Sequence, residues 1–149
     1  MRSYAEAVNA MGADMIAVPG DFVNSQFEEV HPLREAFSIL SAAYGVFGVL
    51  GNHDFYTRRV DDVSREIELG GISLLRNRHL EIRKNGERIH LAGVDDTGNK
   101  FTAAGYFRSV CGSGEARLPR ILLCHRPYFF PEAAARGFDV VLSDHTHGG

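Results

Sequence analysis

The sequence has no tryptophan, only two cysteines and no strong excess of either charge. Its net charge of −3, with histidine neutral, does not indicate a surface for nucleic acid. Two cysteines are too few for a disulfide framework, so we expect a reducing compartment, the cytoplasm. No apolar run approaches the roughly 20 residues of a membrane-spanning helix, and the first residues lack the apolar stretch of a signal peptide. The composition, 44% hydrophobic and 23% charged, is that of an ordinary globular protein.

Four short apolar segments each run into residues that can bind a metal or an anion. Their composition predicts buried strands. The pairs of segment and polar residues are Ile16-Ala17-Val18 before Gly20-Asp21, residues 46–50 before Gly51-Asn52-His53-Asp54, Ile121-Leu122-Leu123 before His125, and Val140-Val141-Leu142 before Asp144-His145-Thr146-His147. Because α/β sheets bind ligands outside the carboxyl ends of their strands, the repetition predicts one site at one sheet edge.

The chain reads as alternating helices and strands, then a meander, then strand, helix and strand. We expect helices at residues 2–11, 32–40, 60–67 and 131–136, and strands at 14–18, 46–50, 72–75, 80–83, 88–92, 119–123 and 138–142. Asn85-Gly86 predicts a hairpin turn in an antiparallel middle section. Residues 95–118 read as a long loop with one helical turn at 102–107. With no linker or repeat, residues 1–149 form one domain, an α/β (α+β) fold with a mixed sheet or two stacked sheets flanked by helices.

The polar residues after the first two strands allow two interpretations. The Asp21 carboxylate could bridge two divalent cations, although a Gly-Asp pair is often only a turn. Asn52 offers a neutral oxygen ligand for Mn²⁺, Mg²⁺, Fe or Zn²⁺. His53 could face a substrate phosphate as a general acid or as a cation, with Asp54 bonded to its ring. The alternative is a polar turn without a special role.

Histidines follow the last two strands. His125 is a candidate ligand or a loop residue, and its neighbour Arg126 could touch a phosphate or simply be solvated. His145 and His147 lie two residues apart, so an extended segment would place both rings on one side. We expect the remaining polar candidates to be structural or solvated. They are His31 at a helix start, His79 and His90 on solvent faces of the meander, and Asp95-Asp96 in a solvated turn.

Taken together, Gly20-Asp21, Gly51-Asn52-His53-Asp54, His125 and His145-Thr146-His147 resemble the calcineurin-like metallophosphoesterase superfamily. The stretch 121–149 looks most like the bacterial branch of lipid-A-precursor (UDP-diacylglucosamine) phosphoesterases. The resemblance implies a two-sheet mixed β-sandwich flanked by helices that hydrolyses phosphomonoesters or phosphodiesters with a metal-activated hydroxide. It also implies a phosphate-ester substrate, in that branch a nucleotide-linked lipid, and a cytoplasmic location peripheral to the membrane.

The resemblance also implies a role for each motif residue. Asp21 would bridge two divalent ions, whether Mn²⁺, Fe²⁺/Fe³⁺, Zn²⁺ or Mg²⁺. Asn52, His125 and His145 would complete the shell of the second ion, and His147 would bind the first. His53, oriented by Asp54, would contact the phosphate and assist the leaving group.

Two departures from the superfamily pattern leave an alternative open. The superfamily begins with a strand ending in Asp-x-His and continues beyond its His-x-His motif, whereas this chain has neither, so we expect a domain truncated at both termini with one well-occupied ion. Asp144 stands where the superfamily has glycine, as an exposed residue or a substitute ligand. The alternative function is therefore a catalytically impaired domain with a binding or assembly role or no activity. Self-association through the exposed sheet edge could supply the missing strand.

Overall fold

The computed structural model describes residues 2–96, 100–111 and 118–146. Its helices and strands follow in the order α1 (Arg2–Ala10), β1 (Ile16–Val18), α2 (Val30–Phe37), β2 (Val46–Gly48), α3 (Asn52–Tyr56), α4 (Val60–Leu69), β3 (Ser73–Leu74), β4 (Arg78–Lys84), β5 (Glu87–Val94), α5 (Lys100–Val110), β6 (Arg120–Cys124), α6 (Phe130–Ala135) and β7 (Val140–Leu142). Short 3₁₀ turns precede α2 and α6. Most elements lie where the apolar periodicity predicts them.

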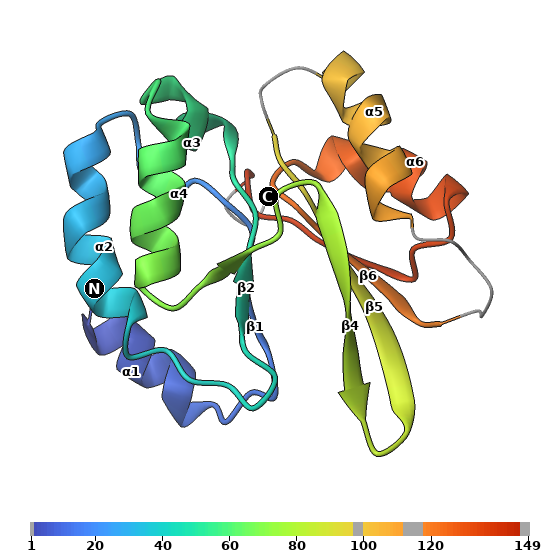
Figure 1. The fold of residues 1–149 in the computed structure, drawn as a ribbon, viewed down its shortest axis with the longest axis horizontal. Coiled ribbons are helices and arrows are strands. Elements are labelled where there is room, and N and C mark those ends of the chain that lie inside the picture. Colours follow the sequence, from blue (N-terminus) through green and yellow to red (C-terminus); the bar gives the residue numbers. More distant parts are fainter. Residues whose placement is uncertain (1, 97–99, 112–117, 147–149) are drawn as a thin grey trace.

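The strands form two sheets. The first has the order β1-β2-β3 and is parallel throughout. The second has the order β4-β5-β6-β7, with β4 antiparallel to β5 and the other pairs parallel. Figure 1 shows α1, α2 and α4 outside the first sheet and α5 and α6 outside the second. The predicted two-sheet α/β fold is therefore confirmed, with layers in the order helix, sheet, sheet, helix.

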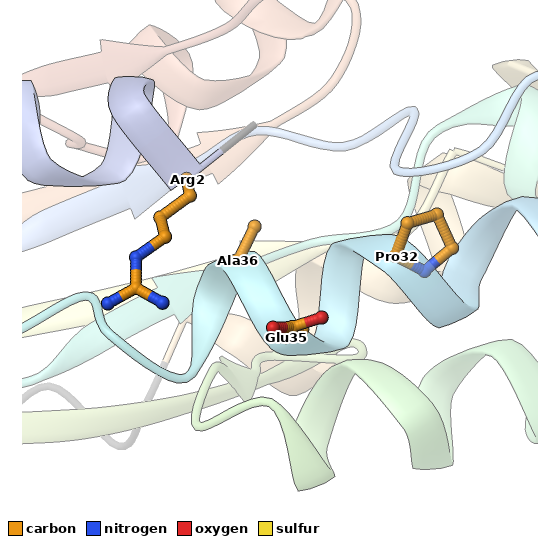
Figure 2. Close-up of a pocket in the computed structure, with 4 residues that line it drawn as sticks. All are labelled: Arg2, Pro32, Glu35 and Ala36. Atoms are coloured by element: carbon orange, nitrogen blue, oxygen red, sulfur yellow. The ribbon is translucent and has the colours of Figure 1, made fainter.

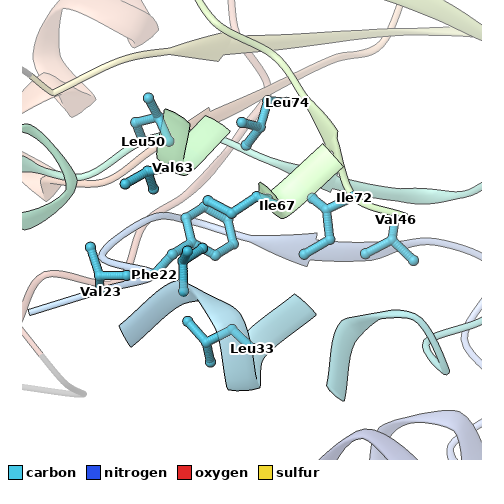
Figure 3. Packing of buried hydrophobic residues seen from close by; sticks show 10 residues of the cluster. Phe22, Val23, Leu33, Val46, Leu50, Val63, Ile67, Ile72 and Leu74 are labelled. Atoms are coloured by element: carbon cyan, nitrogen blue, oxygen red, sulfur yellow. The ribbon is translucent and has the colours of Figure 1, made fainter. Parts of the chain in front are cut away.

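Three apolar clusters fill the spaces between these layers. Between the two sheets lie Phe47, Val49, Leu75, Leu91 and Leu123. Phe22, Leu33, Ile67 and their neighbours join the first sheet to α2 and α4 (Figure 3). On the far face of the second sheet, a third cluster includes Phe107 and Val110 of α5 and Ala133 of α6. Burial of this apolar surface drives the stacking of the layers.

The middle of the chain differs from the expectation in two respects. β3 pairs in parallel with β2, so only β4 and β5 form the antiparallel hairpin, which turns at Asn85-Gly86 with positive φ at both residues. The segment expected to be a long loop instead contains the 11-residue helix α5. The side chains of Phe107 and Val110 are buried against the second sheet. Tertiary packing therefore stabilises a helix that Gly105 and the polar residues of this segment do not favour.

Candidate metal centre

The candidate site lies where strands from both sheets end. Asp21 follows β1, Asn52 begins α3 after β2, His125 follows β6, and His145 follows β7. In Figure 1 the carboxyl ends of β2 and β6 lie at the same end of the molecule, the end that carries α3. This is the edge at which an α/β sheet offers its backbone ends and loops to a ligand.

Asp21 is fixed between the ends of the two sheets. Its φ of 53° lies in the left-handed region, which aspartate tolerates better than most residues do. Oδ1 accepts a hydrogen bond of 3.0 Å from the backbone N–H of His53, and Oδ2 lies 3.0 Å from Nε2 of His125. A Cβ atom at Gly51 would collide with Oδ1 of Asp21, so glycine is needed for this close approach.

His125 is almost fully buried, with 1% of its surface exposed. Its Nδ1 lies 2.9 Å from the carbonyl oxygen of Pro19, and because a carbonyl can only accept, Nδ1 carries the proton in the neutral ring. Nε2 is then left with its lone pair, 3.0 Å from Asp21 Oδ2 and 3.0 Å from His145 Nδ1. A hydrogen bond from the far ring nitrogen to a carbonyl is the usual way in which a metal-binding histidine is oriented.

The loop after β7 is tied to the end of β6 through the backbone. The N–H groups of Asp144 and His145 both donate to the carbonyl oxygen of His125, each at 3.1 Å. As a result, one potential ligand atom from each of Asp21, His125 and His145 lies within 4.8 Å of the others. Two imidazoles and a carboxylate at this separation fit a transition-metal ion such as Zn²⁺, Fe or Mn²⁺.

The charges of Asp21 and His145 suit a cation. Burial favours the neutral form of Asp21, but its bonds with His125 and His53 outweigh this effect and lower the pKa of the carboxyl. Burial likewise opposes the charged form of His125, but Asp21 and the Pro19 carbonyl raise its pKa overall. Burial, followed by the charges of His125 and Arg126, lowers the pKa of His145. Asp21 is therefore an anion, and His145 favours the neutral form that binds metals.

Asn52 carries the clearest sign of an unfilled ligand position. Only 3% of its surface is exposed, its Nδ2 donates to the hydroxyl oxygen of Tyr56 at 3.0 Å, and its Oδ1 has no hydrogen-bond partner. A buried acceptor without a partner costs roughly 1–3 kcal/mol, so it normally indicates a missing ligand or water. A ligand or water bound beside α3 would give this oxygen a partner.

His53 and Asp54 do not form the contact that we expected from the sequence. Nδ1 of His53 lies 2.7 Å from the carbonyl oxygen of Asn24, and Nε2 lies 4.0 Å from Asp21 Oδ2. Asp54 instead accepts backbone N–H bonds from Val23 at 3.1 Å and from Gly51 at 2.9 Å. The ring of His53 is therefore oriented by a backbone carbonyl, and Asp54 shapes the two loops that meet at the site.

Burial also changes the protonation of Asp54. Its side chain is fully enclosed, and desolvation raises its pKa to about 6 although the backbone N–H bonds favour the charged form. The nearby charge of Asp21 also raises this pKa. The carboxyl of Asp54 thus titrates close to neutral pH, unlike that of Asp21.

The other predicted residues meet different outcomes. His147 lies outside the described residues, and Asp144 is exposed to solvent. The prediction that Asp95-Asp96 form a solvated turn is wrong, because both side chains are buried at the end of β5. Each carboxylate has an arginine within 3.0 Å, which makes its burial tolerable.

Tyr56 is a contact residue that the sequence did not reveal. Its hydroxyl oxygen accepts the hydrogen bond from Asn52, and its ring centroid lies 5.1 Å from that of His53. Tyr56 lies four residues after Asn52 and three after His53, a spacing that brings side chains together on a helix. We expected a turn there, so the spacing was not interpretable before α3 was seen.

A separate pocket lies on the helical layer and has a different character. Its volume is about 180 Å³, and its lining comes from α1 and α2: Arg2, Pro32, Glu35 and Ala36 (Figure 2). A single carboxylate beside an arginine is a weak cation site. The chemistry of the described residues is therefore concentrated at the strand ends.

Comparison with known proteins gives a consistent family. The chain is 31% identical over 139 residues to an uncharacterised metallophosphoesterase of Aquifex aeolicus, covering 91% of this chain and 51% of the relative. It is 28% identical over 141 residues to the uncharacterised metallophosphoesterase YkoQ of Bacillus subtilis, with coverage of 91% and 50%. A transmembrane protein with a metallophosphoesterase domain from Danio rerio is 29% identical over 158 residues, with coverage of 100% and 36%. These similarities support the calcineurin-like metallophosphoesterase superfamily as the family of this chain.

The match covers only part of each relative. The chain spans about a third to a half of the length of the relatives just described. No family model matches the sequence. Within the described residues, no helix combines the length and apolar character needed to cross a membrane.

Proposed function

We propose that this chain is a metal-dependent phosphoric ester hydrolase whose ion is held by Asp21, Asn52, His125 and His145. One observation carries the proposal: the ligand atoms of Asp21, His125 and His145 converge within 4.8 Å at the ends of three different strands. The orphaned Oδ1 of Asn52 supports it independently. The family of named metallophosphoesterases indicates the type of bond that is hydrolysed.

The protein groups divide the work of such a reaction. When bound, a divalent ion neutralises phosphoryl oxygens and generates the nucleophile from water. Asp21 would hold the ion, and through its hydrogen bond with the backbone N–H of His53 it fixes the start of α3. His53 has 36% of its side chain exposed, and its Nδ1 donates to Asn24, so Nε2 points toward Asp21 and the solvent. In its protonated form, this nitrogen can donate a proton to the leaving oxygen.

Metal-dependent turnover of bis-p-nitrophenyl phosphate and p-nitrophenyl phosphate tests the proposal. We expect activity with Mn²⁺, a loss with Asn52→Ala or His145→Ala together with lost metal binding, and a roughly 10²–10⁴-fold lower kcat with His53→Ala. His53→Ala should still bind the ion, since His53 is not placed as a ligand. His31→Ala, on the exposed side of α2, is the matched control and should behave as the wild type does.

The result also separates the two functions that the sequence left open. A folded protein that binds the ion but turns over neither ester with any divalent metal would overturn the hydrolase and leave a metal-binding domain. The identity of the natural ester, including a nucleotide-linked lipid, stays a prediction, as do the second ion and the involvement of His147.

A further inference from the structure

Two acidic residues at the end of β5 are buried next to each other, and each has its own arginine. Asp95 Oδ2 accepts a hydrogen bond of 3.0 Å from Arg76 Nε, and Asp96 Oδ2 lies 3.0 Å from Arg126 Nε. The backbone N–H of Asp96 donates to the carbonyl oxygen of Leu50 at 3.0 Å, so these residues lie where the two sheets meet. The two pairs can therefore be compared directly.

The Arg76–Asp95 pair joins secondary-structure elements. Arg76 Nη1 donates to Asp61 Oδ1 at 3.0 Å and lies 3.5 Å from Ser64 Oγ, and both partners belong to α4. The guanidinium thus connects α4 to the end of β5 with directed hydrogen bonds. A structural role accounts for these contacts.

The Arg126–Asp96 pair has a different geometry. Nε of Arg126 and Oδ2 of Asp96 are 3.0 Å apart, but their orientation does not make a hydrogen bond, so this contact is an ion pair held by charge. The guanidinium carbon lies 5.7 Å from the ring centroid of Tyr128, and 19% of the Arg126 side chain is exposed. The attraction to Asp96 and a side-chain hydrogen bond with Tyr128 hold the guanidinium at the end of β6, where part of it is open to solvent.

Arg126 also lies beside the candidate metal ligands. It follows His125 directly, and its partner Asp96 is bonded through its backbone N–H to Leu50, two residues before Asn52. The pair therefore lies where the segments after β2 and β6 meet, next to those that carry Asn52 and His125. A guanidinium there is well placed for a phosphate, whose oxygens match its fork of N–H donors.

We propose that Arg126 binds a phosphoryl oxygen of the substrate beside the metal ligands and that Asp96 positions its guanidinium. This inference rests on the proposed function and adds a substrate-contact residue to it. Asp96 balances the charge of Arg126 when no anion is bound and keeps the side chain from turning away into solvent. Arg76, which pairs with the neighbouring Asp95, has no such role.

Calorimetric titration of inorganic phosphate into the Mn²⁺-loaded protein tests this directly and needs no turnover. We compare the wild type with Arg126→Lys, which keeps the charge and loses the fork, and with Arg76→Lys as the matched control. Loss of a charge-assisted, two-point contact should weaken phosphate binding by roughly tenfold or more in Arg126→Lys. Arg76→Lys should bind phosphate as the wild type does, and both variants should retain the ion, as measured by plasma mass spectrometry.

A second variant covers the case in which Arg126→Lys does not fold. The double change Asp96→Asn with Arg126→Gln removes both charges together, so neither remains buried without a partner, and it should show the same loss of phosphate affinity. Equal phosphate affinity in Arg126→Lys and Arg76→Lys, or no phosphate binding by the metal-loaded wild type, would overturn the inference. Phosphate binding that depends on Arg126 without any ester turnover would instead remove the hydrolase and keep the anion site.

Discussion

Asp54 and Asn52 belong to the same four-residue motif, yet they have opposite surroundings. The carboxylate of Asp54 is enclosed and accepts N–H bonds from Val23 and Gly51, whereas Oδ1 of Asn52 is enclosed and has no hydrogen-bond partner. The first arrangement is complete without a ligand. The Asn52 oxygen obtains a partner only when a ligand is bound. We therefore assign Asn52 to the metal and Asp54 to the support of the loops.

This difference predicts the effect of Asp54→Asn. An amide offers one acceptor oxygen where the carboxylate offers two, and its NH₂ group would face a backbone N–H. We expect the free energy of unfolding of the metal-free protein to fall by about 1–3 kcal/mol, as measured by urea denaturation.

Asp14→Asn is the matched control for that experiment. Asp14 is largely exposed and lies 3.7 Å from Lys84, so its change should cost less than about 1 kcal/mol. An Asp54→Asn protein as stable as the control would show that the two backbone bonds do not hold the loops.

At the same scale, the sequence predicted which residue types gather but not how they are held. The strand-end pattern brings Asp21, His125 and His145 together, as expected. The partner of His53 could not be predicted, because the backbone of Asn24 comes near only through the path of the loop after β1. The burial of Asp96 could not be predicted either. An Asp-Asp pair after a strand is typical of a solvated turn, and the contact with Arg126 that makes burial tolerable comes from a distant part of the chain.

Among the elements, the two sheets pack very closely at Gly93 of β5. A Cβ atom there would collide with the side chain and the carbonyl oxygen of Leu75, and it would lie 2.7 Å from Cγ1 of Val49. Backbone atoms cannot move away as a side chain can. The close contact between the two sheets therefore depends on glycine, which has no side chain, at position 93.

Gly93→Ala should accordingly destabilise the protein by about 1–3 kcal/mol, the range for overpacking a core. Gly105→Ala provides the same chemical change on α5, where an added Cβ meets no atom within 4 Å. It should be neutral or stabilise by up to about 1 kcal/mol, because alanine favours a helix. Thermal denaturation of the two variants checks both signs, and equal effects would contradict the close packing at Gly93.

A histidine also joins the second sheet to the end of α5. His90 was expected on a solvent face, but it is buried, stacked on His79 with ring centroids 4.7 Å apart. Its Nε2 donates to the carbonyl oxygen of Val110 at 2.8 Å. Burial lowers the pKa of His90, the Val110 carbonyl opposes this, and the charges of His79 and Arg120 lower it further, with Glu81 acting in the opposite sense.

This arrangement predicts a pH dependence of stability. Below pH about 6.5 the unfolded chain takes up a proton at this position, while the folded chain resists it, so the free energy of unfolding falls as the solution becomes more acidic. His90→Gln keeps a donor for Val110 but cannot titrate. Urea denaturation between pH 7 and 5 should show a smaller loss in the variant than in the wild type. A constant difference between the two would contradict the prediction.

Three features of the fold could not be predicted from the periodicity of apolar residues, each for a physical reason. α5 depends on long-range burial of Phe107 and Val110, and α3 is only five residues long and begins with polar residues. The parallel pairing of β3 with β2 is set by the crossover through α4, which a strand pattern alone does not report. By contrast, the hairpin at Asn85-Gly86 is determined locally by residues that accept positive φ, and it was predicted correctly.

On the scale of the whole molecule, the proposed metal ligands gather where the two sheets meet. The proposed ligands come from both sheets: Asp21 and Asn52 from the first, and His125 and His145 from the second. A bound ion would therefore link the two halves of the sandwich and stabilise the fold by mass action, by about 2.7 kcal/mol at a concentration 100 times its dissociation constant. Self-association through a free sheet edge stays a prediction that sedimentation velocity can test.

The central claim is that these residues form a metal site, and equilibrium metal binding tests it most directly. The protein is stripped with chelator and titrated with Mn²⁺ and Zn²⁺ in a calorimeter, alongside Asp21→Asn and His145→Ala. The account predicts one tightly bound ion per chain in the wild type, a matching rise in Tm, and at least a tenfold weaker affinity in each variant. No saturable binding by the folded wild type, or an unchanged affinity in His145→Ala, would contradict it.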